Sequence, residues 1–586
     1  MRRLLLQSNL TSVAGLLRED MVKPVASAPE PEKVEAKPLR AFGRSLRDFP
    51  SLSPAESELL RCCRMGAMAH LGQDRPQTES EETMLRAGFV RFLAMGGDDE
   101  APVHENGVRV QGGWIVGSVT LSGAQIDAPL SLINCRIEEI EAELCSVNTL
   151  VLSGSLIESG IDGDRLRSTG SIWINGVTAN GPIRLVGAEV GGILSLSGAT
   201  LSVSGLVALC CDGATITGSL FLGSGFKSNG EVRLLSARIG GSLECAGGSF
   251  RNPGDDALSC DRATISGSAF LHNGFHAEGS VRLNATHIGS SLELIRSTFR
   301  NEEGVALTCD QAVVRGTMFL QKSTFAGIVS MSGTQVGGIC DDDHVWQTST
   351  GKLVLDGFSY QRFTGTARTD AGGRIEWLCK QLPHHMGTEF KPNPWEHLSS
   401  VLRNMGHLED AREVAIAKHK KMRAAGRFVG GSKVWDLVYG ALVGYGYRPW
   451  RLVGIMSLVW ATCTIVYLPA VNPQWFDSKH HLIRPAVSQA EAICRSTTPP
   501  EKHLNSCAAH RPRYRDFFVP AYSAEVLIPL ITFGYKGDWR PVVSTADGKP
   551  LFFGWVVRVI YWFEIIFGWL ASLLLVAAVG NLIKRE

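Results

Sequence analysis

The residues whose types and order point most directly to chemistry lie in a short apolar stretch, residues 517–539, near the C-terminus. Seven consecutive residues in it combine a hydroxyl, aromatic rings, glycines, a cation and a carboxylate: Thr532, Phe533, Gly534, Tyr535, Lys536, Gly537 and Asp538. The stretch is too short and proline-broken to span a bilayer, but it is apolar enough to dip into one. A cation filter needs consecutive backbone carbonyls aimed at one axis, and glycine permits the required dihedral angles. The pattern therefore makes these seven the candidate pore-lining residues.

The order of residues 532–538 resembles the potassium-channel filter Thr-Val-Gly-Tyr-Gly-Asp with one lysine inserted. Lys536 breaks the spacing of the carbonyls and places an ammonium near the path, which argues against potassium selectivity. In the apolar segment that follows, Glu564 would face the pore and Gly568 would act as a hinge. The alternative is a hairpin that only anchors this segment, with Gly568 in helix packing and Glu564 near the interface or paired with Arg558.

Motifs for catalysis, cofactors and metals give no support to an enzyme. The chain has no GxGxxG after a strand, no P-loop, no GxSxG elbow and no CxxC pair of zinc spacing, so we expect no catalytic, cofactor-binding or metal residues. Aspartates at one repeat position are interpreted as turn formers: Asp212, Asp261 and Asp310. The run from Asp341 to His344 is interpreted as a solvated loop, and the adjacent His384 and His385 are a weak metal signal.

These residues must be positioned by a repeat that fills the middle of the chain. Its clearest copies are LCCDGATITGSLFL from Leu209, LSCDRATISGSAFL from Leu258 and LTCDQAVVRGTMFL from Leu307, which are 49 residues apart. Apolar alternation over five residues, separated by Gly, Ser and Asn, is typical of short strands joined by turns. A mainly β chain is expected, with a parallel β-solenoid over residues 105–372 of roughly ten coils of about 24 residues each.

The repeat and its flanks resemble a group of bacterial membrane-anchored solenoid proteins related to the pentapeptide-repeat solenoids. The shared features are RAGFVRFLAMGG from Arg86, GVRVQGGWIVGSVTLSGAQI from Gly107, EHLSSVLRNMGHLEDAREVAIAKHKK and GYGYRPW. Few five-residue units here follow the strict pentapeptide pattern. Members are often labelled membrane-associated oxidoreductase, but the group has no established activity, so the resemblance implies architecture and transfers no site.

The segments around the solenoid have distinct compositions. Residues 1–47 are expected to be disordered linker, because Pro, Ala, Glu and Lys dominate their second half. Residues 48–104 predict a helical cap, with Ser53 as N-cap and Glu56 completing a capping box. Residues 373–433 predict a helical hairpin similar to one tetratricopeptide unit.

Residues 434–586 are expected to form a membrane domain. Residues 452–470 and 561–583 are apolar enough to be transmembrane helices. Basic residues precede the first helix and follow the second: Lys418, Lys420, Lys421, Arg423, Arg427, Lys433, Lys584 and Arg585. The positive-inside rule then places both termini and the solenoid in the cytoplasm of a bacterial inner membrane. The loop between the helices would face the oxidising side, where Cys494 and Cys507 are the candidate disulfide.

Composition adds bounds on the partners. The formal charge of +1 over 586 residues gives no support to nucleic-acid binding. The eight cysteines from Cys135 to Cys340 are expected to be small packing residues in a reducing compartment. We therefore expect a membrane-anchored, non-enzymatic scaffold, with the lipid bilayer, an unknown protein bound by the solenoid and a second copy of the chain as partners. The alternatives are an oligomeric pore regulated by the solenoid and an enzyme with an unrecognised site.

Overall fold

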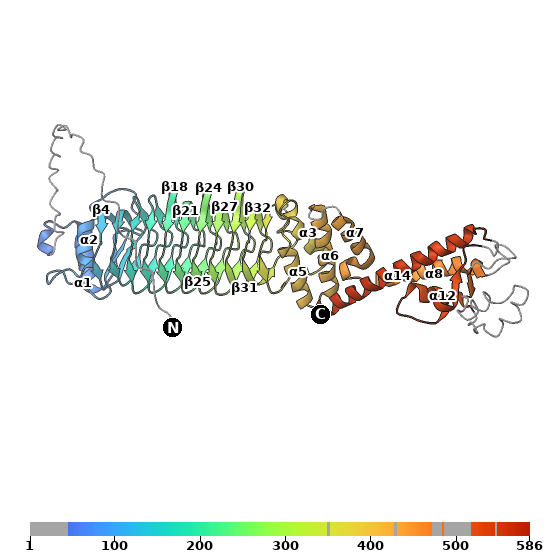
Figure 1. Ribbon diagram of the computed structural model, residues 1–586. Helices are drawn as coiled ribbons and strands as arrows, with labels where there is room; N and C mark the ends of the chain where they lie inside the picture. Colours follow the sequence, from blue (N-terminus) through green and yellow to red (C-terminus); the bar gives the residue numbers. More distant parts are fainter. Residues whose placement is uncertain are drawn as a thin grey trace, which may run out of the picture.

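The computed structural model describes residues 45–347, 352–426, 431–471, 483–485, 517–544 and 548–585. The predicted linker therefore lies almost wholly outside the described residues. The chain forms a long rod of β-coils, followed by a group of helices and then by two long apolar helices (Figure 1). The mainly β architecture and the parallel solenoid predicted from the repeat are confirmed, with about 11 turns in the solenoid.

Two parallel sheets line opposite sides of the rod (Figure 1). In each, the strands pair in parallel with strands of the adjacent coils, and most strands are only two residues long. The longer strands of one sheet are β4 (Trp114–Thr120), β7 (Arg136–Glu141), β18 (Thr200–Cys210), β21 (Lys227–Arg233), β24 (Ser249–Ser259), β27 (His276–Arg282), β30 (Thr298–Thr308) and β32 (Thr324–Ser330). The longer strands of the other are β3 (Val108–Gln111), β6 (Leu130–Ile133), β31 (Val313–Phe319) and β33 (Gln335–Cys340).

Wide and narrow coils alternate, and this alternation explains the 49-residue period. Lys227 pairs with Thr200, 27 residues before it, and with Ser249, 22 residues after it. The extra residues of each wide coil form a bulge in the middle of its long strand, opposite a single glycine of the next coil. At Gly279, with φ 120°, an added Cβ would lie 2.5 Å from the carbonyl oxygen of Asn252, so only glycine fits.

The core of the rod is a ladder of apolar side chains, because alternate residues of each strand point inward. Five fully buried phenylalanines stack from coil to coil with ring centroids 4.9–5.3 Å apart: Phe226, Phe250, Phe275, Phe299 and Phe325. The eight cysteines from Cys135 to Cys340 are also buried and free, as expected. Continuous stacking of this kind leaves little freedom between adjacent coils.

Two helices pack at the N-terminal end of the rod, α1 (Pro54–Met65) and α2 (Ala87–Ala94). Ser53 caps α1, and its hydroxyl accepts the amide of Glu56 at 3.0 Å while the Glu56 carboxylate accepts the amide of Ser53, which confirms the predicted capping box. Between the helices, β1 (Ala69–His70) and β2 (Met84–Arg86) pair with β3 and β4. An incomplete first coil thus lies within the segment where the sequence predicted helices.

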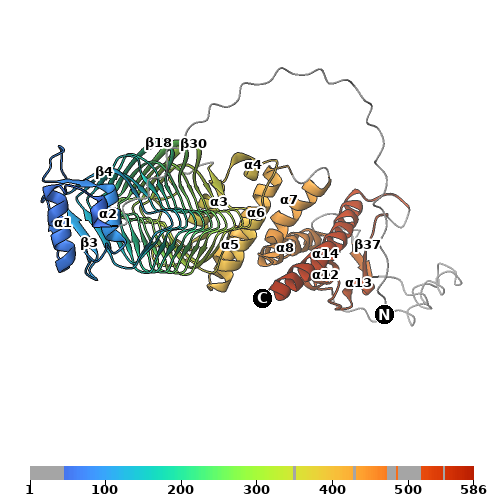
Figure 2. The same ribbon diagram turned by 90° about the vertical axis from the view of Figure 1, so that its left-hand side faces the viewer.

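The C-terminal part of the described chain is helical. The helices are α3 (Ala371–Cys379), α4 (Pro383–Met386), α5 (Asn393–Asn404), α6 (Leu408–Ala424), α7 (Gly431–Val443), α8 (Trp450–Val471), α12 (Val519–Leu527), α13 (Tyr535–Asp538) and α14 (Phe552–Arg585). Helices α5 and α6 pack on each other at the end of the solenoid (Figure 2). By length and composition, two helices are able to cross a membrane, over Trp450–Ala470 and Phe552–Gly580.

Candidate functional surfaces of the solenoid and the apolar helices

The bulges of the wide coils form a ridge along one edge of the rod, where β18, β24 and β30 stand out in Figure 1. We define the ridge as residues 203–206, 252–255 and 301–304. Its crests expose Leu206, Asp255 and the pair Glu302 and Glu303. The ridge is therefore a mostly acidic, periodic surface with one exposed aliphatic side chain.

Beside the ridge lies a groove of about 540 Å³ between three coils. Arg282 forms ion pairs there with Asp261 and, at 3.4 Å, with Asp256. Arg233 forms the equivalent pair with Asp212 at 2.7 Å, one repeat earlier. Most charges of the groove are neutralised by their neighbours, so its recognition chemistry is a patterned set of hydrogen-bonding groups rather than a strong field.

The repeated aspartates do more than form their own turns. The Oδ1 atoms of Asp212, Asp261 and Asp310 accept backbone amides of the next coil, from Leu235, Asn284 and Ser332, at 2.8–3.1 Å. These bonds tie successive turns together and occupy the carboxylates. The interpretation as structural residues agrees with this geometry, and the three do not converge on one point where a substrate would sit.

The groove still contains groups with altered acidity. Burial raises the pKa of Glu231 above its ordinary value. Burial also raises the pKa of Asp256, with Arg282 opposing it. The solenoid thiols are further from reactivity, because burial raises the pKa of Cys135 to about 12 and raises that of Cys260 beyond this value. A thiol in such surroundings stays protonated and is a poor nucleophile.

The run that begins at Asp341 is not a simple solvated loop, so that prediction was wrong for its first residue. Asp341 is buried and accepts two hydrogen bonds of 2.8 Å from the guanidinium of Arg374 and one of 2.7 Å from the indole of Trp346. Asp342 caps the backbone amide of Val345 at 3.1 Å. Asp343 and His344 are exposed, and Asp343 pairs with an arginine at the surface. The carboxylate is buried because helix α3 supplies its counter-charge.

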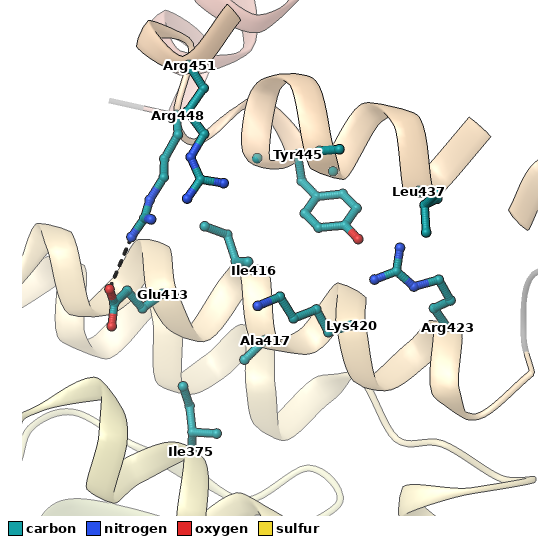
Figure 3. Close-up of a pocket in the computed structure, with 13 residues that line it drawn as sticks. Ile375, Glu413, Ile416, Ala417, Lys420, Arg423, Leu437, Tyr445, Arg448 and Arg451 are labelled. Carbon is teal, nitrogen blue, oxygen red and sulfur yellow. Dashed lines mark hydrogen bonds and ion pairs between the residues drawn. The ribbon is translucent and has the colours of Figure 1, made fainter. Parts of the chain in front are cut away.

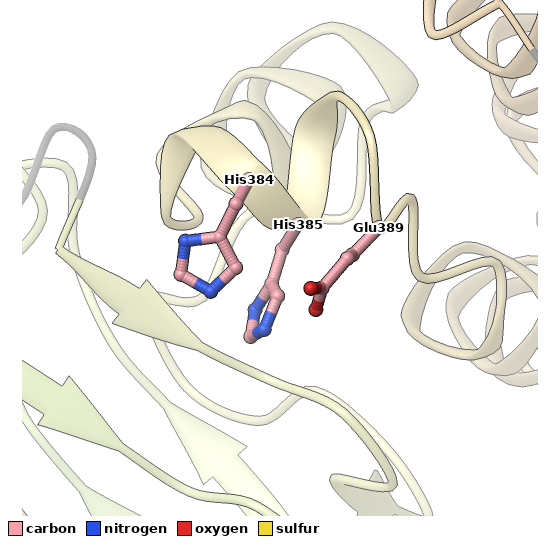
Figure 4. Close-up of side chains that lie close together, drawn as sticks. All are labelled: His384, His385 and Glu389. Atoms are coloured by element: carbon pink, nitrogen blue, oxygen red, sulfur yellow. The ribbon is translucent and has the colours of Figure 1, made fainter.

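His384, His385 and Glu389 lie close together on and just after α4 (Figure 4). Their ligand atoms are within 4.8 Å of one another, whereas tetrahedral ligands at ~2.0 Å from zinc are separated by ~3.3 Å. Burial lowers the pKa of His385, helped by the neighbouring His384, which keeps the ring neutral near pH 7. The donor set suits zinc, but His384 and Glu389 are exposed to water, and the trio carries no functional assignment here.

The filter-like residues lie in the segment that connects α12 to α14. Thr532 and Phe533 are exposed, Gly534 has φ 89°, and Tyr535–Asp538 form the single turn α13. The Glu525 carboxylate accepts the backbone amides of Tyr535 at 2.7 Å and of Lys536 at 3.3 Å. Carbonyls in a helical turn point along its axis, so these residues form a capped turn in one copy of the chain rather than an extended carbonyl row.

Glu564 and Gly568 both face α12. The fully buried Glu564 carboxylate accepts hydrogen bonds from the hydroxyl of Tyr467 in α8, at 2.8 Å, and from that of Ser523 in α12. A Cβ added at Gly568 would lie 1.8 Å from the carbonyl oxygen of Leu527, so this glycine lets α14 approach the end of α12. Glu564 therefore lies where α8, α12 and α14 meet. The sequence pattern did not point to either of its partners, Tyr467 and Ser523.

Cys494 and Cys507, the candidate disulfide, lie outside the described residues. Comparison of the chain with protein-family models, curated proteins and solved structures gives no match.

Proposed function

We propose that the chain is a non-enzymatic scaffold anchored in a bacterial inner membrane, with both termini and the solenoid on the cytoplasmic side. The observation that carries this proposal is one continuous apolar core, which runs from Ala55 in α1 through the coils to Val414 in α6. Because no break in packing separates these parts, they move as one rod. A rigid rod that is joined to two helices of membrane-spanning length is suited to hold a long binding surface at a fixed place on the membrane.

The helices at each end of the rod fit this role. An open end coil would offer unpaired backbone groups to other chains, and we infer that α1 and α2 cover that edge. At the other end, α3, α5 and α6 couple the rod to the membrane helices, and Glu413 of α6 forms an ion pair of 3.1 Å with Arg448, in the turn that precedes α8. Through these contacts, the position of the membrane helices fixes the position of the solenoid.

The surface proposed for recognition is the ridge with its groove. Its two acidic crests, at Asp255 and at Glu302 and Glu303, favour a basic, extended partner surface, from another protein or from a second copy of the chain. The raised pKa of buried solenoid thiols such as Cys135 and Cys260, and the ion pairs of Asp256 and Asp261 with Arg282, support binding rather than catalysis.

The test is site-specific photo-crosslinking in cells at Leu206 and Glu303 on the ridge. The control position is Thr264, an exposed residue of β25 (Thr264–Ile265) in the opposite sheet. We expect a discrete adduct at both ridge positions and none at Thr264, and an adduct of twice the chain mass would identify self-assembly. Equal labelling at all three positions would contradict a dedicated recognition face.

The second candidate is a pore, favoured by the filter-like residues and by the buried carboxylate of Glu564. Ion flux into proteoliposomes separates the two functions. A scaffold gives no flux from correctly inserted protein. A pore gives flux that changes in Glu564→Ala or on deletion of Lys536.

A further inference from the structure

A second pocket, of about 470 Å³, lies where the rod meets the apolar helices. One wall is α6, and the other is formed by α7, the turn at Tyr445 and the start of α8 (Figure 3). The pocket therefore spans the junction between the solenoid-bearing part and the candidate membrane helices. Anything bound there would contact both.

The pocket is lined by four cationic side chains. Lys420 and Arg423 come from α6, and Arg448 and Arg451 come from the turn before α8 and its first residues. Figure 3 shows the nitrogen-bearing ends of Arg451, Lys420 and Arg423 turned into the space between α6 and Tyr445. Cationic groups from separate elements that converge on one space form the type of site that binds phosphate oxygens.

Only part of this charge is neutralised by the protein. Arg448 pairs with Glu413 at 3.1 Å and Arg423 with Asp436 at 3.5 Å. Within the ranges that the structure covers, Lys420 and Arg451 form no ion pair. Four cations against two carboxylates leave the pocket with two positive charges, on Lys420 and Arg451, and both side chains are exposed and therefore accessible to an anion.

The surroundings of the pocket favour a lipid as the source of that anion. Trp450, the first residue of the candidate span, is 82% exposed, and on α7 Val434 and Trp435 are 64% and 58% exposed. Exposed tryptophan and aliphatic side chains beside a membrane-length helix are typical of the bilayer interface. The basic pocket would then lie at the level of the lipid headgroups, where anionic lipids attract lysine and arginine.

We propose that this pocket binds the phosphate of an anionic phospholipid headgroup and so fixes α6, and the solenoid with it, to the membrane surface. This inference rests on the proposed membrane anchoring. It adds a ligand class and a role for that ligand. A phosphate bound by α6 on one side and by Arg451 on the other links the rod to the membrane helices.

The experiment measures lipid binding to the full-length protein in detergent by native mass spectrometry. The probes are phosphatidylglycerol, phosphatidylcholine with the same acyl chains, and inorganic phosphate. The test variant is Lys420→Gln/Arg451→Gln. The matched control is Lys421→Gln/Arg403→Gln, which removes the same charges from α6 and α5 outside the pocket.

We expect the wild type to bind phosphatidylglycerol about tenfold or more tightly than phosphatidylcholine, since each cation near such a headgroup contributes ~1 kcal/mol. The test variant should lose this preference and the control should keep it. Equal binding of the two lipids by the wild type, an equal loss in the control, or inorganic phosphate binding as tightly as phosphatidylglycerol would each overturn the assignment, the last in favour of a soluble phosphate ligand.

Alkaline extraction of membranes from the same cells separates failure of this inference from failure of the anchoring proposal. A wild type that stays in the membrane but shows no lipid preference overturns the lipid site alone. A wild type released by alkali overturns the anchoring itself.

Discussion

Arg374 in α3 donates two hydrogen bonds of 2.8 Å to the carboxylate of Asp341 at the end of the solenoid, and both side chains are only 3% exposed. The same guanidinium lies 3.8 Å from the ring centroid of Phe363. Asp341 follows the last residue of β33, so this pair attaches the helical region directly to the final coils. It is a buried, fully hydrogen-bonded ion pair at the joint between rod and helices.

Removal of one partner of this pair should destabilise the rod strongly. Asp341→Ala leaves the Arg374 charge buried without a counter-ion, which typically costs ~3–5 kcal/mol. We expect the thermal unfolding of the full-length protein, followed by far-UV circular dichroism, to shift down by several degrees. Asp343→Ala removes an exposed carboxylate two residues away and should cost less than about 1 kcal/mol. Equal shifts in the two variants would contradict the structural role of Asp341.

Gly279→Ala should disrupt the alternation of coils. Its Cβ would meet the carbonyl oxygens of Asn252 and Asp255 at 2.5 and 2.7 Å, and φ of 120° is unfavourable for alanine. Gly254→Ala on the ridge also has positive φ, but an added Cβ there meets nothing within 4 Å. We expect Gly254→Ala to cost ~1–2 kcal/mol and Gly279→Ala clearly more. Unfolding temperatures of the two proteins provide the comparison, and a smaller loss for Gly279→Ala would refute the close approach.

The pH dependence of stability should differ in sign between Glu231 and Glu278, which lie two coils apart on β21 and β27. Burial raises the pKa of Glu231, so its contribution is favourable below the ordinary glutamate pKa and is lost as pH rises through the raised value. Glu231→Gln should therefore raise the unfolding temperature at pH 7 and have little effect at pH 4.

Glu278 is the matched control for that measurement. Burial also acts on its pKa, but His276 and Arg251 outweigh burial and lower it. Its contribution is present above the ordinary pKa and is lost as pH falls through the lowered value. Glu278→Gln should therefore lower the unfolding temperature at pH 7, with a difference that shrinks in acid. The same sign for both variants at pH 7 would be inconsistent with these environments.

Gly568→Ala tests the packing of α12 against α14. The new Cβ would lie 1.8 Å from the Leu527 carbonyl, so the helices must separate. We expect a lower unfolding temperature in detergent and less monodisperse protein on size-exclusion chromatography. Gly580→Ala in the same helix meets nothing within 4 Å and should behave as wild type. If Gly568→Ala is also unaffected, α12 does not pack as described.

The period of the chain was enough to predict the solenoid, because a 49-residue repeat with five-residue alternation has few other structural solutions. The alternation of wide and narrow coils was not predicted, although its signal was present in the glycines that recur at Gly230, Gly279 and Gly327. The phenylalanine ladder had a similar signal in Phe250 and its equivalents. Such features follow from how one coil sits on the next, which a single repeat does not reveal.

The candidate sites were harder to predict because their partners are distant in sequence. Asp341 resembled a solvated acidic residue until Arg374, 33 residues later, was found beside it. Glu564 is held by Ser523 and by Tyr467, which is 97 residues away. Local patterns identify such carboxylates, but only the packing of helices decides whether they meet water, a cation or a hydroxyl.

The spacing of the crests on the ridge affects how many sites one partner can occupy at once, which is separate from how the partner is recognised. The crests are related by translation, one for every two coils, or about 10 Å along the rod. A partner that fits one acidic crest, at Asp255 or at Glu302 and Glu303, therefore finds a second acidic crest one repeat away, and a partner with two matching elements can bind both at once and gain avidity. The even spacing of the crests then decides how many elements of a partner can bind at once, and the side chains that differ from crest to crest decide where along the rod the partner binds.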